Sequence, residues 1–338
     1  MMMQMLMLMA NGKLHPQGGA HLKFTIHTAC VAGVVCAITT VVGAQPYPVK
    51  PIRILCATPG ASGDFSARIV GQGMTAPIGQ PVIVDNRGGY GAIDAVIKSA
   101  PDGYTLLVYG STLWTVPLME NASWDVQRDL VPVALLNSTP STVVVHPSLP
   151  VRSVKALIAF AKARPGQLNY GAAPLGSSQH LASELFKSMA GVNILNVPYK
   201  SSGAAQIGLL GGEVHMMFPP VGSVLPHVKS GRVRLLAVAT AQPSAFLPDV
   251  PTVAASGLPG YEFATVVALF APAGTPEAVI LRINQEAVRV LARADIRQRF
   301  MNEGLEPSPG PPEQLANTIR IETAKFAKLI KDAALRVR

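Results

Sequence analysis

The chain has 338 residues, 49% hydrophobic and 14% charged, so it has enough apolar residues for a large core and too few charges for a disordered protein. Its formal net charge is +9, but its basic residues are scattered and few aromatic residues lie among them, which argues against a nucleic-acid groove. These properties predict a globular protein of about two domains with a mild attraction for small anions.

Residues 1–44 are predicted to be a cleavable signal peptide. A weakly basic region precedes a strictly apolar run over residues 29–38, and residues 42–44 supply small side chains for cleavage. The alternative is a retained membrane anchor over residues 24–42, against which His27 and several threonines argue. We expect cleavage and a periplasmic mature protein.

Cysteine and histidine usage predicts neither a disulfide nor a metal site. Cys56 is the only cysteine outside the leader, and its apolar surroundings predict an inert core residue. His146, His215 and His227 are far apart in the sequence and show no paired ligand spacing. We therefore expect no metal and no cofactor.

Short apolar strands alternate with helices from Tyr47 onward. In the first half we expect strands over residues 52–57, 82–85, 105–109, 131–136 and 142–146, and helices over residues 66–76, 92–99 and 113–119. This alternation predicts a mostly parallel sheet covered on both faces, with ligands bound outside the carboxyl ends of its strands.

The second half repeats the pattern. We expect helices over residues 153–163, 178–190, 204–210 and 225–229, and strands over residues 168–171, 194–197, 214–218 and 234–240. An apolar run over residues 263–271 is expected to return the chain to the first sheet. Long helices, one starting near Pro276 and one over residues 313–333, are expected to cover that sheet.

Five turns of similar composition precede expected helices. They cover residues 59–64, 86–92, 110–112, 172–178 and 198–203. A helix start leaves backbone N–H groups unpaired at the positive end of the helix dipole, which attracts anions. For the first turn, the alternative is a plain connection with Ser62 or Asp64 as N-cap. Together, the turns predict a site for a carboxylate that needs no facing arginine.

An enzyme would need a catalytic set, and the sequence offers only weak ones. Ser62 with Asp64, or Ser177 and Ser178 with His180, are the candidates for a serine hydrolase. No G-x-S-x-G motif is present, and a histidine at a helix start is more often a packed residue than a base. We expect no catalytic residue.

Eight stretches resemble the Bug receptors, the periplasmic solute-binding components of tripartite tricarboxylate transporters. They cover residues 47–53, 79–87, 100–106, 180–186, 197–200, 209–212, 247–252 and 271–276. The resemblance implies a fold of the periplasmic binding protein type II kind, with two α/β domains, two crossover strands and a ligand cleft between the domains. Residues 45–145 with 266–338 would form one domain and residues 146–265 the other, closing at hinges near residues 143–146 and 266–268.

The resemblance also implies ligand-binding loops, to which we add Tyr199 and Phe218 as side chains expected to wall the ligand and Asp64 as a helix cap. The expected site residues are Pro59, Gly60, Ala61, Ser62, Asp64, Ser111, Thr112, Leu175, Gly176, Ser177, Ser178, Tyr199, Lys200, Ser201 and Phe218.

Three stretches depart from the family pattern. The first loop reads Thr58 to Ser62 where Pro-Pro-Gly-Gly is usual, Pro219-Pro220 replaces Asp-Asn, and residues 266–268 replace Trp-Phe-Gly. The last two changes remove polar and aromatic groups, so we expect a more apolar pocket and prefer an apolar or aromatic acid as ligand.

The resulting prediction is a receptor that captures a small organic carboxylate and delivers it to a membrane permease of the tripartite tricarboxylate type. One alternative is an interaction module that presents its ligand to a membrane sensor, and another is the serine hydrolase. None of the three involves nucleic acid.

Overall fold

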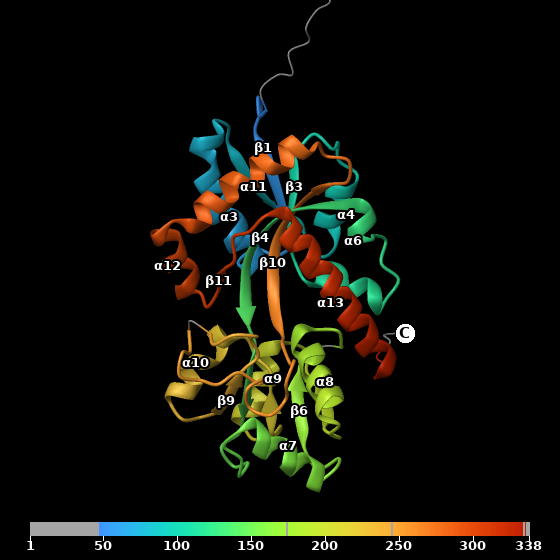
Figure 1. Ribbon diagram of the computed structural model, residues 1–338, viewed down its shortest axis with the longest axis vertical. Helices are drawn as coiled ribbons and strands as arrows, with labels where there is room; N and C mark the ends of the chain where they lie inside the picture. Colours follow the sequence, from blue (N-terminus) through green and yellow to red (C-terminus); the bar gives the residue numbers. More distant parts are fainter. Residues whose placement is uncertain (1–46, 174, 245, 334, 336–338) are drawn as a thin grey trace, which may run out of the picture. The chain divides into compact units, whose positions relative to one another are not determined.

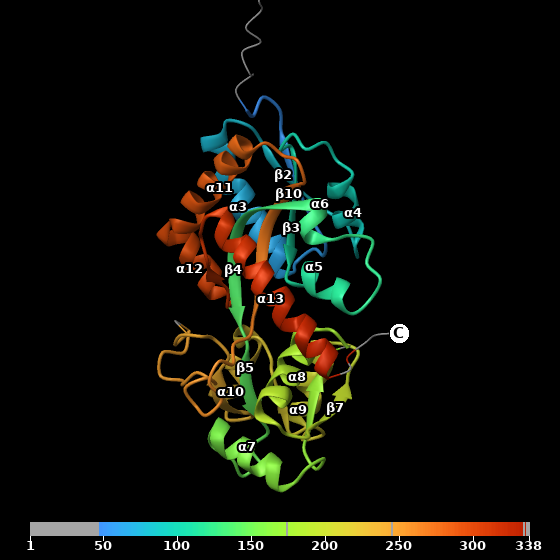
Figure 2. The same cartoon turned by 45° about the vertical axis from the view of Figure 1, so that its right-hand side comes forward.

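The computed structural model describes residues 47–173, 175–244, 246–333 and 335. Its strands form two sheets, one of six strands and one of five, with helices packed on both (Figures 1 and 2). We call the six-stranded sheet with its helices the first lobe and the five-stranded sheet with its helices the second lobe. This architecture is the predicted α/β class, but the sheets are mixed and not mostly parallel as expected, because β10 pairs antiparallel with β3 and β4, and β5 with β8 and β9. The predicted leader lies outside the described residues.

The first sheet has the strand order β11-β4-β10-β3-β1-β2. Its strands are β1 (Ile52–Cys56), β2 (Val82–Asn86), β3 (Thr105–Gly110), β4 (Leu130–Pro140), β10 (Ala264–Pro272) and β11 (Glu306–Pro307). Because β1 runs parallel to both β2 and β3, the carboxyl ends of these three strands lie at one edge. The first three predicted turns therefore meet there.

Helices cover both faces of the first sheet. One face carries α3 (Ser62–Ile78), α11 (Glu277–Ala292) and α12 (Ala294–Asn302); the other carries α4 (Gly91–Ile97), α5 (Thr112–Thr115), α6 (Val126–Asp129), the 3₁₀ turn η1 (Val116–Leu118) and the first half of α13 (Pro312–Asp332). Burial on both faces explains why β1 is apolar except at Arg53, which is exposed. No helix in the described part of the chain is long and apolar enough to cross a membrane.

The second sheet has the order β7-β6-β8-β5-β9. Its strands are β5 (Thr142–Val145), β6 (Asn169–Ala172), β7 (Leu195–Pro198), β8 (Met216–Met217) and β9 (Arg234–Val238). One face packs on α7 (Val154–Ala163) and α8 (Ser178–Ala190), and the other on α9 (Ser202–Leu210) and α10 (Val221–Lys229). Parallel pairing of β6 with β7 brings the fourth and fifth predicted turns to one edge.

The chain changes sheets at Ser141, which separates β4 from β5, and returns between Val238 and Ala264. The residues that we expected to act as hinges, 143–146 and 266–268, lie almost wholly inside β5 and β10. Pro140 pairs with Ala264 in the first sheet, whereas Ser141 O accepts from Ala239 N at 2.8 Å and Phe263 N donates to Ala239 O at 2.7 Å in the second lobe. The chain is therefore best placed to bend between Pro140 and Ser141 and between Phe263 and Ala264. The exact division into two domains stays a prediction.

Helix α13 contacts both lobes, whereas we expected it to cover the first sheet alone. Leu315 and Ile319 pack in the first lobe, while Phe326, Leu329 and Ile330 pack among residues of the second lobe, including Leu181 and Leu185 of α8 (Figures 1 and 2). At 1.5 Å per residue, its 21 residues extend about 30 Å, enough to reach both.

Candidate functional site

Helix α3 begins at Ser62, four residues before the predicted start, so the first turn is shorter than expected. Its N-cap is Ala61, in extended conformation, and not Ser62 or Asp64. Alanine has no side-chain acceptor, so the backbone N–H groups of Ser62 and Gly63 at the start of α3 have no cap. Ala61 and Ser62 are both exposed. The start of α3 therefore leaves backbone N–H groups without a side-chain cap, and their binding of an anion stays a prediction.

Asp64 lies in the first turn of α3 and is only 6% exposed. Its carboxylate pairs with Arg68 Nε at 2.9 Å, and accepts hydrogen bonds from Gly60 N at 2.9 Å and Asn86 Nδ2 at 3.0 Å. Burial acts to raise the pKa of Asp64, but the hydrogen bonds from Arg68, Gly60 and Asn86 lower it to about 2. Asp64 thus fixes the turn by pairing back to Gly60, and its charge is compensated within the protein.

The thiol of Cys56 belongs to the same network. Cys56 is fully buried, and its Sγ lies 3.7 Å from Asp64 Oδ1 and 3.1 Å from Asn86 Nδ2. Burial, with Asp64 beside it, raises the pKa of the thiol to about 12. A thiol that stays protonated is a poor nucleophile, which agrees with the prediction of an inert core cysteine.

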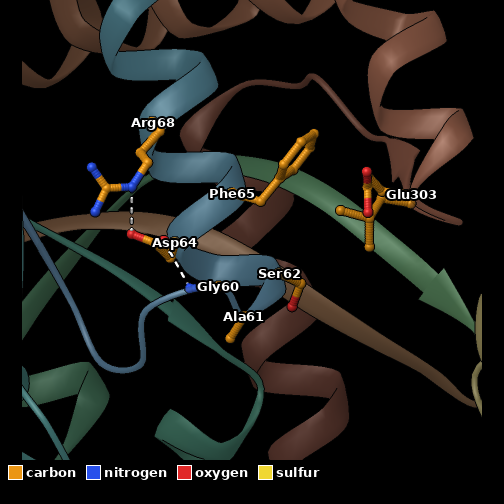
Figure 3. Close-up of a pocket in the computed structure, with 8 residues that line it drawn as sticks. Gly60, Ala61, Ser62, Asp64, Phe65, Arg68 and Glu303 are labelled. Carbon is orange, nitrogen blue, oxygen red and sulfur yellow. Dashed lines mark hydrogen bonds and ion pairs between the residues drawn. The ribbon is translucent and has the colours of Figure 1, made fainter.

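A cavity of about 310 Å³ opens at the start of α3 (Figure 3). It contains four predicted residues, Gly60, Ala61, Ser62 and Asp64, and four that we did not predict, Phe65, Arg68, Glu303 and Leu305. Arg68 follows Asp64 by four residues on the same helix face, a spacing that would have identified it from the sequence. Glu303 and Leu305 are more than 230 positions away in the sequence, so no local pattern indicates them.

The other predicted residues of the first lobe lie at the same sheet edge but do not line this cavity. Ser111 and Thr112 follow β3, which pairs with β1, and Ser111 N donates to Val266 O at 3.0 Å. Helix α5, which they open, has only four residues and a correspondingly small dipole. Pro59 is exposed and also lies outside the lining.

In the second lobe, the two predicted turns are joined by a side-chain hydrogen bond. Gln179 Nε2 of α8 donates to Ser202 Oγ of α9, and Tyr199 N donates to Ala172 O at 2.8 Å. The hydroxyls of Ser177 and Ser201 are N-caps, accepting from His180 N at 3.3 Å and from Ala204 N at 3.2 Å. One backbone N–H group at the start of α8 and one at the start of α9 are therefore already hydrogen-bonded to a serine cap, whereas the start of α3 has no side-chain cap.

The remaining residues of these two turns differ in exposure. Leu175 and Lys200 are exposed, Ser178 is half-buried and Gly176 is buried. Gly176 has φ +84°, and a Cβ there would lie 2.6 Å from Met119 Cε of the first lobe. The fourth turn thus contacts the first lobe directly, and its positive φ favours glycine, while a Cβ there would have to displace the end of the Met119 side chain.

Two predicted aromatic residues do not have the positions expected of ligand walls. Phe218 is 1% exposed, with its ring 5.4 Å from that of Phe186 and 6.3 Å from that of Tyr261. The Tyr199 ring packs over Gly208 of α9, and its hydroxyl donates to Glu213 Oε2 at 3.0 Å. Phe218 is therefore a core residue. The position of the Tyr199 side chain is explained by its packing on α9.

In the departure at residues 266–268, Val266 lines the larger cavity described below, and the other two residues pack in the sheet. Val267 is 3% exposed and Ala268 is fully buried in β10, and neither lines the α3 cavity. Val267 and Ala268 are apolar because they are buried in the sheet, so these two residues give no support to an apolar or aromatic ligand.

A larger cavity, of about 480 Å³, lies where β4 and β10 meet α13 and residues 240–243. Its lining includes Glu262, Glu306 and Glu322, against one cation, Lys325. Burial raises the pKa of Glu322, although a hydrogen bond from Trp114 Nε1 at 2.8 Å opposes the shift. Three carboxyl groups make this cavity less suitable for a carboxylate than the cavity at α3, where the charge of Asp64 is paired with Arg68.

The histidine offered for a hydrolase is a packed residue. His180 is 2% exposed, its Nδ1 accepts a hydrogen bond from Gly176 N at 3.3 Å, and burial lowers its pKa. Ser177 Oγ contacts the backbone of His180, not its ring. These contacts give no support to a serine–histidine pair.

Comparison with known proteins identifies the family. The model of the tripartite tricarboxylate transporter family receptor matches residues 66–335. The chain belongs to this receptor family. It is 35% identical over 308 residues to protein BugT of Bordetella pertussis, covering 89% of this chain and 94% of BugT. The predicted resemblance to Bug receptors is thereby confirmed, and this is a family of solute-binding receptors rather than of enzymes.

Two solved structures are similar to this chain over nearly their whole length. Rpa4515 of R. palustris, solved with adipate, is 34% identical with a TM-score of 0.71, covering 86% of this chain and 99% of that one. MatC of Rhodopseudomonas palustris, solved with bound malate, is 27% identical with a TM-score of 0.67, covering 84% and 100%. Both support the two-domain binding-protein fold.

Proposed function

We propose that this receptor binds a small organic carboxylate at the start of α3 and delivers it to a membrane permease. The supporting observation is the uncapped N-terminus of a 17-residue helix that opens into a cavity in a chain of this family. Two relatives were solved with dicarboxylates, adipate and malate. We therefore expect a carboxylate here, and the apolar or aromatic preference is not retained.

One helix start is too weak to hold such a ligand by itself. A helix N-terminus contributes about 0.3–1 kcal/mol and each neutral hydrogen bond about 1 kcal/mol, against about 8 kcal/mol for a micromolar complex. Further donors must come from the second lobe, where Ser177 and Ser201 each keep a hydroxyl proton while accepting from the backbone. We infer that binding closes the lobes by bending between Pro140 and Ser141 and between Phe263 and Ala264, where the backbone pairing changes from one sheet to the other.

Substitutions at Ser62 test the role of the α3 backbone. Ser62 is the first helical residue and follows Ala61 with φ −78° and ψ 166°, a conformation that tolerates proline at Ser62. Ser62→Pro removes both the hydroxyl and one N–H group, whereas Ser62→Ala removes the hydroxyl alone. We expect Ser62→Pro to weaken carboxylate binding at least fivefold more than Ser62→Ala.

Binding is measured by calorimetry with malate, adipate and benzoate, and with 1,6-hexanediol as the uncharged match for adipate. We expect at least one acid to bind and the diol not to bind. Equal binding of the diol and the acids, or equal affinity in the two Ser62 variants, would contradict the proposal. Hydrolysis of a carboxylate ester that is lost in Ser62→Ala and Ser177→Ala would favour the hydrolase.

We also propose that residues 1–44 direct export to the periplasm and are removed. Mass spectrometry of the protein from a periplasmic fraction should show a chain that begins at Gln45. A chain found only in the membrane fraction, with residues 24–42 retained, would show that the segment is an anchor.

The permease partner is tested by uptake of a labelled carboxylate into cells. Deleting the receptor should abolish uptake, and the wild-type receptor but not Ser62→Pro should restore it. A receptor that binds the acid, leaves uptake unchanged and co-purifies with a membrane sensor would favour the sensor alternative.

A further inference from the structure

Two histidines that the sequence separates by 69 positions are neighbours in the second sheet. The antiparallel register of β5 and β8 pairs Val144 with Met217 and Val145 with Met216, so the next pair is His146 with His215. The backbone continues the ladder there, because His146 N donates to His215 O at 2.9 Å. Directly opposed residues of an antiparallel pair have Cβ atoms about 4.5–5.5 Å apart and side chains on the same face.

The burial pattern identifies that face. Side chains alternate along a strand, so His146 is on the side of Val144, and His215 on the side of Met217. Both of these residues belong to the core cluster that packs on α9. A Cβ on Gly212, just beyond α9, would lie 3.4 Å from His146 Cε1, which places this imidazole at the end of that helix. Both histidines are half-buried, at the rim of this core and not inside it.

Each imidazole has its Nδ1 atom held by a neighbouring polar group. His215 Nδ1 lies 2.6 Å from Asn169 Oδ1, and His146 Nδ1 lies 2.7 Å from Ser148 Oγ. In the tautomer in which Nδ1–H donates to these oxygens, the lone pair is on Nε2. The backbone N–H groups of Asn169 and Ser148 also face the two Nδ1 atoms, at 3.2 and 3.3 Å, and serve the other tautomer.

Metal-binding histidines usually show this arrangement, with one nitrogen oriented by a hydrogen bond and the other left for the ion. We propose that His146 and His215 form a two-histidine site for a divalent transition-metal ion, with Nε2 of each ring as ligand and water in the other positions. Imidazole suits zinc, copper and nickel, while calcium and magnesium prefer oxygen ligands.

We expect this two-histidine site to bind its metal ion weakly and reversibly. Among the described residues, no group of three histidine, cysteine or acidic side chains is placed to hold a metal ion. Two protein ligands leave most coordination positions to solvent, so we expect binding without a role in folding. Tyr170 of β6 pairs with Met216 of β8, and the two strands are parallel. His215, which precedes Met216, therefore lies at the amino ends of β6 and β8, whereas the predicted anion-binding turns follow the carboxyl ends of β6 and β7. The proposal is therefore independent of the proposed function.

The test uses the mature protein without a histidine tag, titrated with nickel sulfate in a calorimeter and applied to an immobilised-nickel column. We expect one equivalent to bind, and binding to fall at least tenfold in both His146→Gln and His215→Gln. The matched control is His227→Gln on α10, whose imidazole is also half-buried and which should bind as the wild type does. Magnesium sulfate should give no heat of binding.

Two further measurements separate a ligand role from a structural one. Copper should bind more tightly than nickel, and nickel more tightly than zinc or comparably to it, in the order typical of nitrogen sites. Asn169→Ala removes only the group that orients His215 and should weaken nickel binding without abolishing it. Wild-type nickel affinity in both His146→Gln and His215→Gln, with unchanged thermal unfolding, would overturn the proposal. An equal loss in His227→Gln would overturn it as well.

Discussion

The start of α3 in the first lobe and the starts of α8 and α9 in the second differ in how their backbone N–H groups are paired. Ala61 provides no cap to α3, while Ser177 and Ser201 cap α8 and α9 with their own hydroxyls. The first lobe instead fixes its turn through the buried carboxylate of Asp64, which pairs back to Gly60. Because Asp64 holds the turn by accepting from Gly60, the first N–H groups of α3 stay free for a ligand. A serine cap instead occupies one of the first N–H groups of its helix.

The largest effect is expected from Asp64→Asn. This change removes a charged acceptor from Arg68, Gly60 and Asn86, so the free energy of unfolding should fall by about 3 kcal/mol in urea denaturation. The control is Asp295→Asn in α12, where the ion pair with Arg293 is exposed and stability should not change measurably. An equal loss in both variants would show that the Asp64 network does not hold the turn.

The Asp64 network also predicts a pH dependence. Because the pKa of Asp64 is lowered to about 2 in the folded protein, its stabilising effect is fully present above the unfolded-state pKa of about 4. It is lost as the pH falls from about 4 to about 2, where the carboxylate is protonated. Wild-type stability should decline more steeply than that of Asp64→Asn over this range. Parallel declines would contradict the assignment.

A smaller effect is expected at Gly60 in the first predicted turn and Gly176 in the fourth. Gly60 has φ +74° and open space around a Cβ, so Gly60→Ala should cost only the backbone strain of about 1 kcal/mol. Gly176→Ala should cost about 2 kcal/mol, because its Cβ also meets Met119. In a Met119→Ala background, the cost of Gly176→Ala should fall to that of Gly60→Ala. An unchanged cost would mean that the contact between lobes carries no energy.

The serine caps should give effects of about 1 kcal/mol. Ser177→Ala and Ser201→Ala each remove the acceptor for one backbone N–H group at a helix start, and we expect that loss of stability in thermal unfolding. Ser62→Ala, in which no cap is lost, should stay within about 0.5 kcal/mol of the wild type. A larger effect at Ser62 than at Ser177 would reverse the comparison between the lobes.

The smallest effect concerns Glu303, the exposed acid of the α3 cavity. Its charge repels a bound carboxylate, so Glu303→Gln should tighten carboxylate binding about two- to fivefold while stability stays unchanged. Glu313→Gln at the exposed start of α13, which does not line that cavity, should leave the affinity as it was. Weaker binding in Glu303→Gln would instead indicate a ligand with a positively charged group.

Most strands and helices could be predicted from the sequence. Strand β1 and helix α8 lie within one residue of their predicted bounds, because a short apolar run and a serine-capped amphipathic segment are local signals. Helix α12 and strand β11 were missed, and α3 starts earlier than expected. These elements depend on packing, since β11 has only two residues and is defined by its pairing with β4.

The candidate site was predicted only in part. The first turn could be located because a glycine-rich stretch between a strand and a helix has a local signature, and the cavity at α3 contains Gly60, Ala61, Ser62 and Asp64. Phe218 shows the limit of such reasoning, because an aromatic residue after a strand looks the same whether it faces a ligand or the core. Packing against Phe186 and Tyr261 decided between the two.

The sequence by itself determined the α/β class, the family and the bounds of α8, since each depends on residue types at short spacing. Tertiary structure decided which residues share a cavity and which titratable groups are neighbours. Glu303 reaches the α3 cavity, and His146 faces His215, through contacts between segments far apart in the chain. Such contacts follow from strand register and helix packing, which no local pattern of residues specifies.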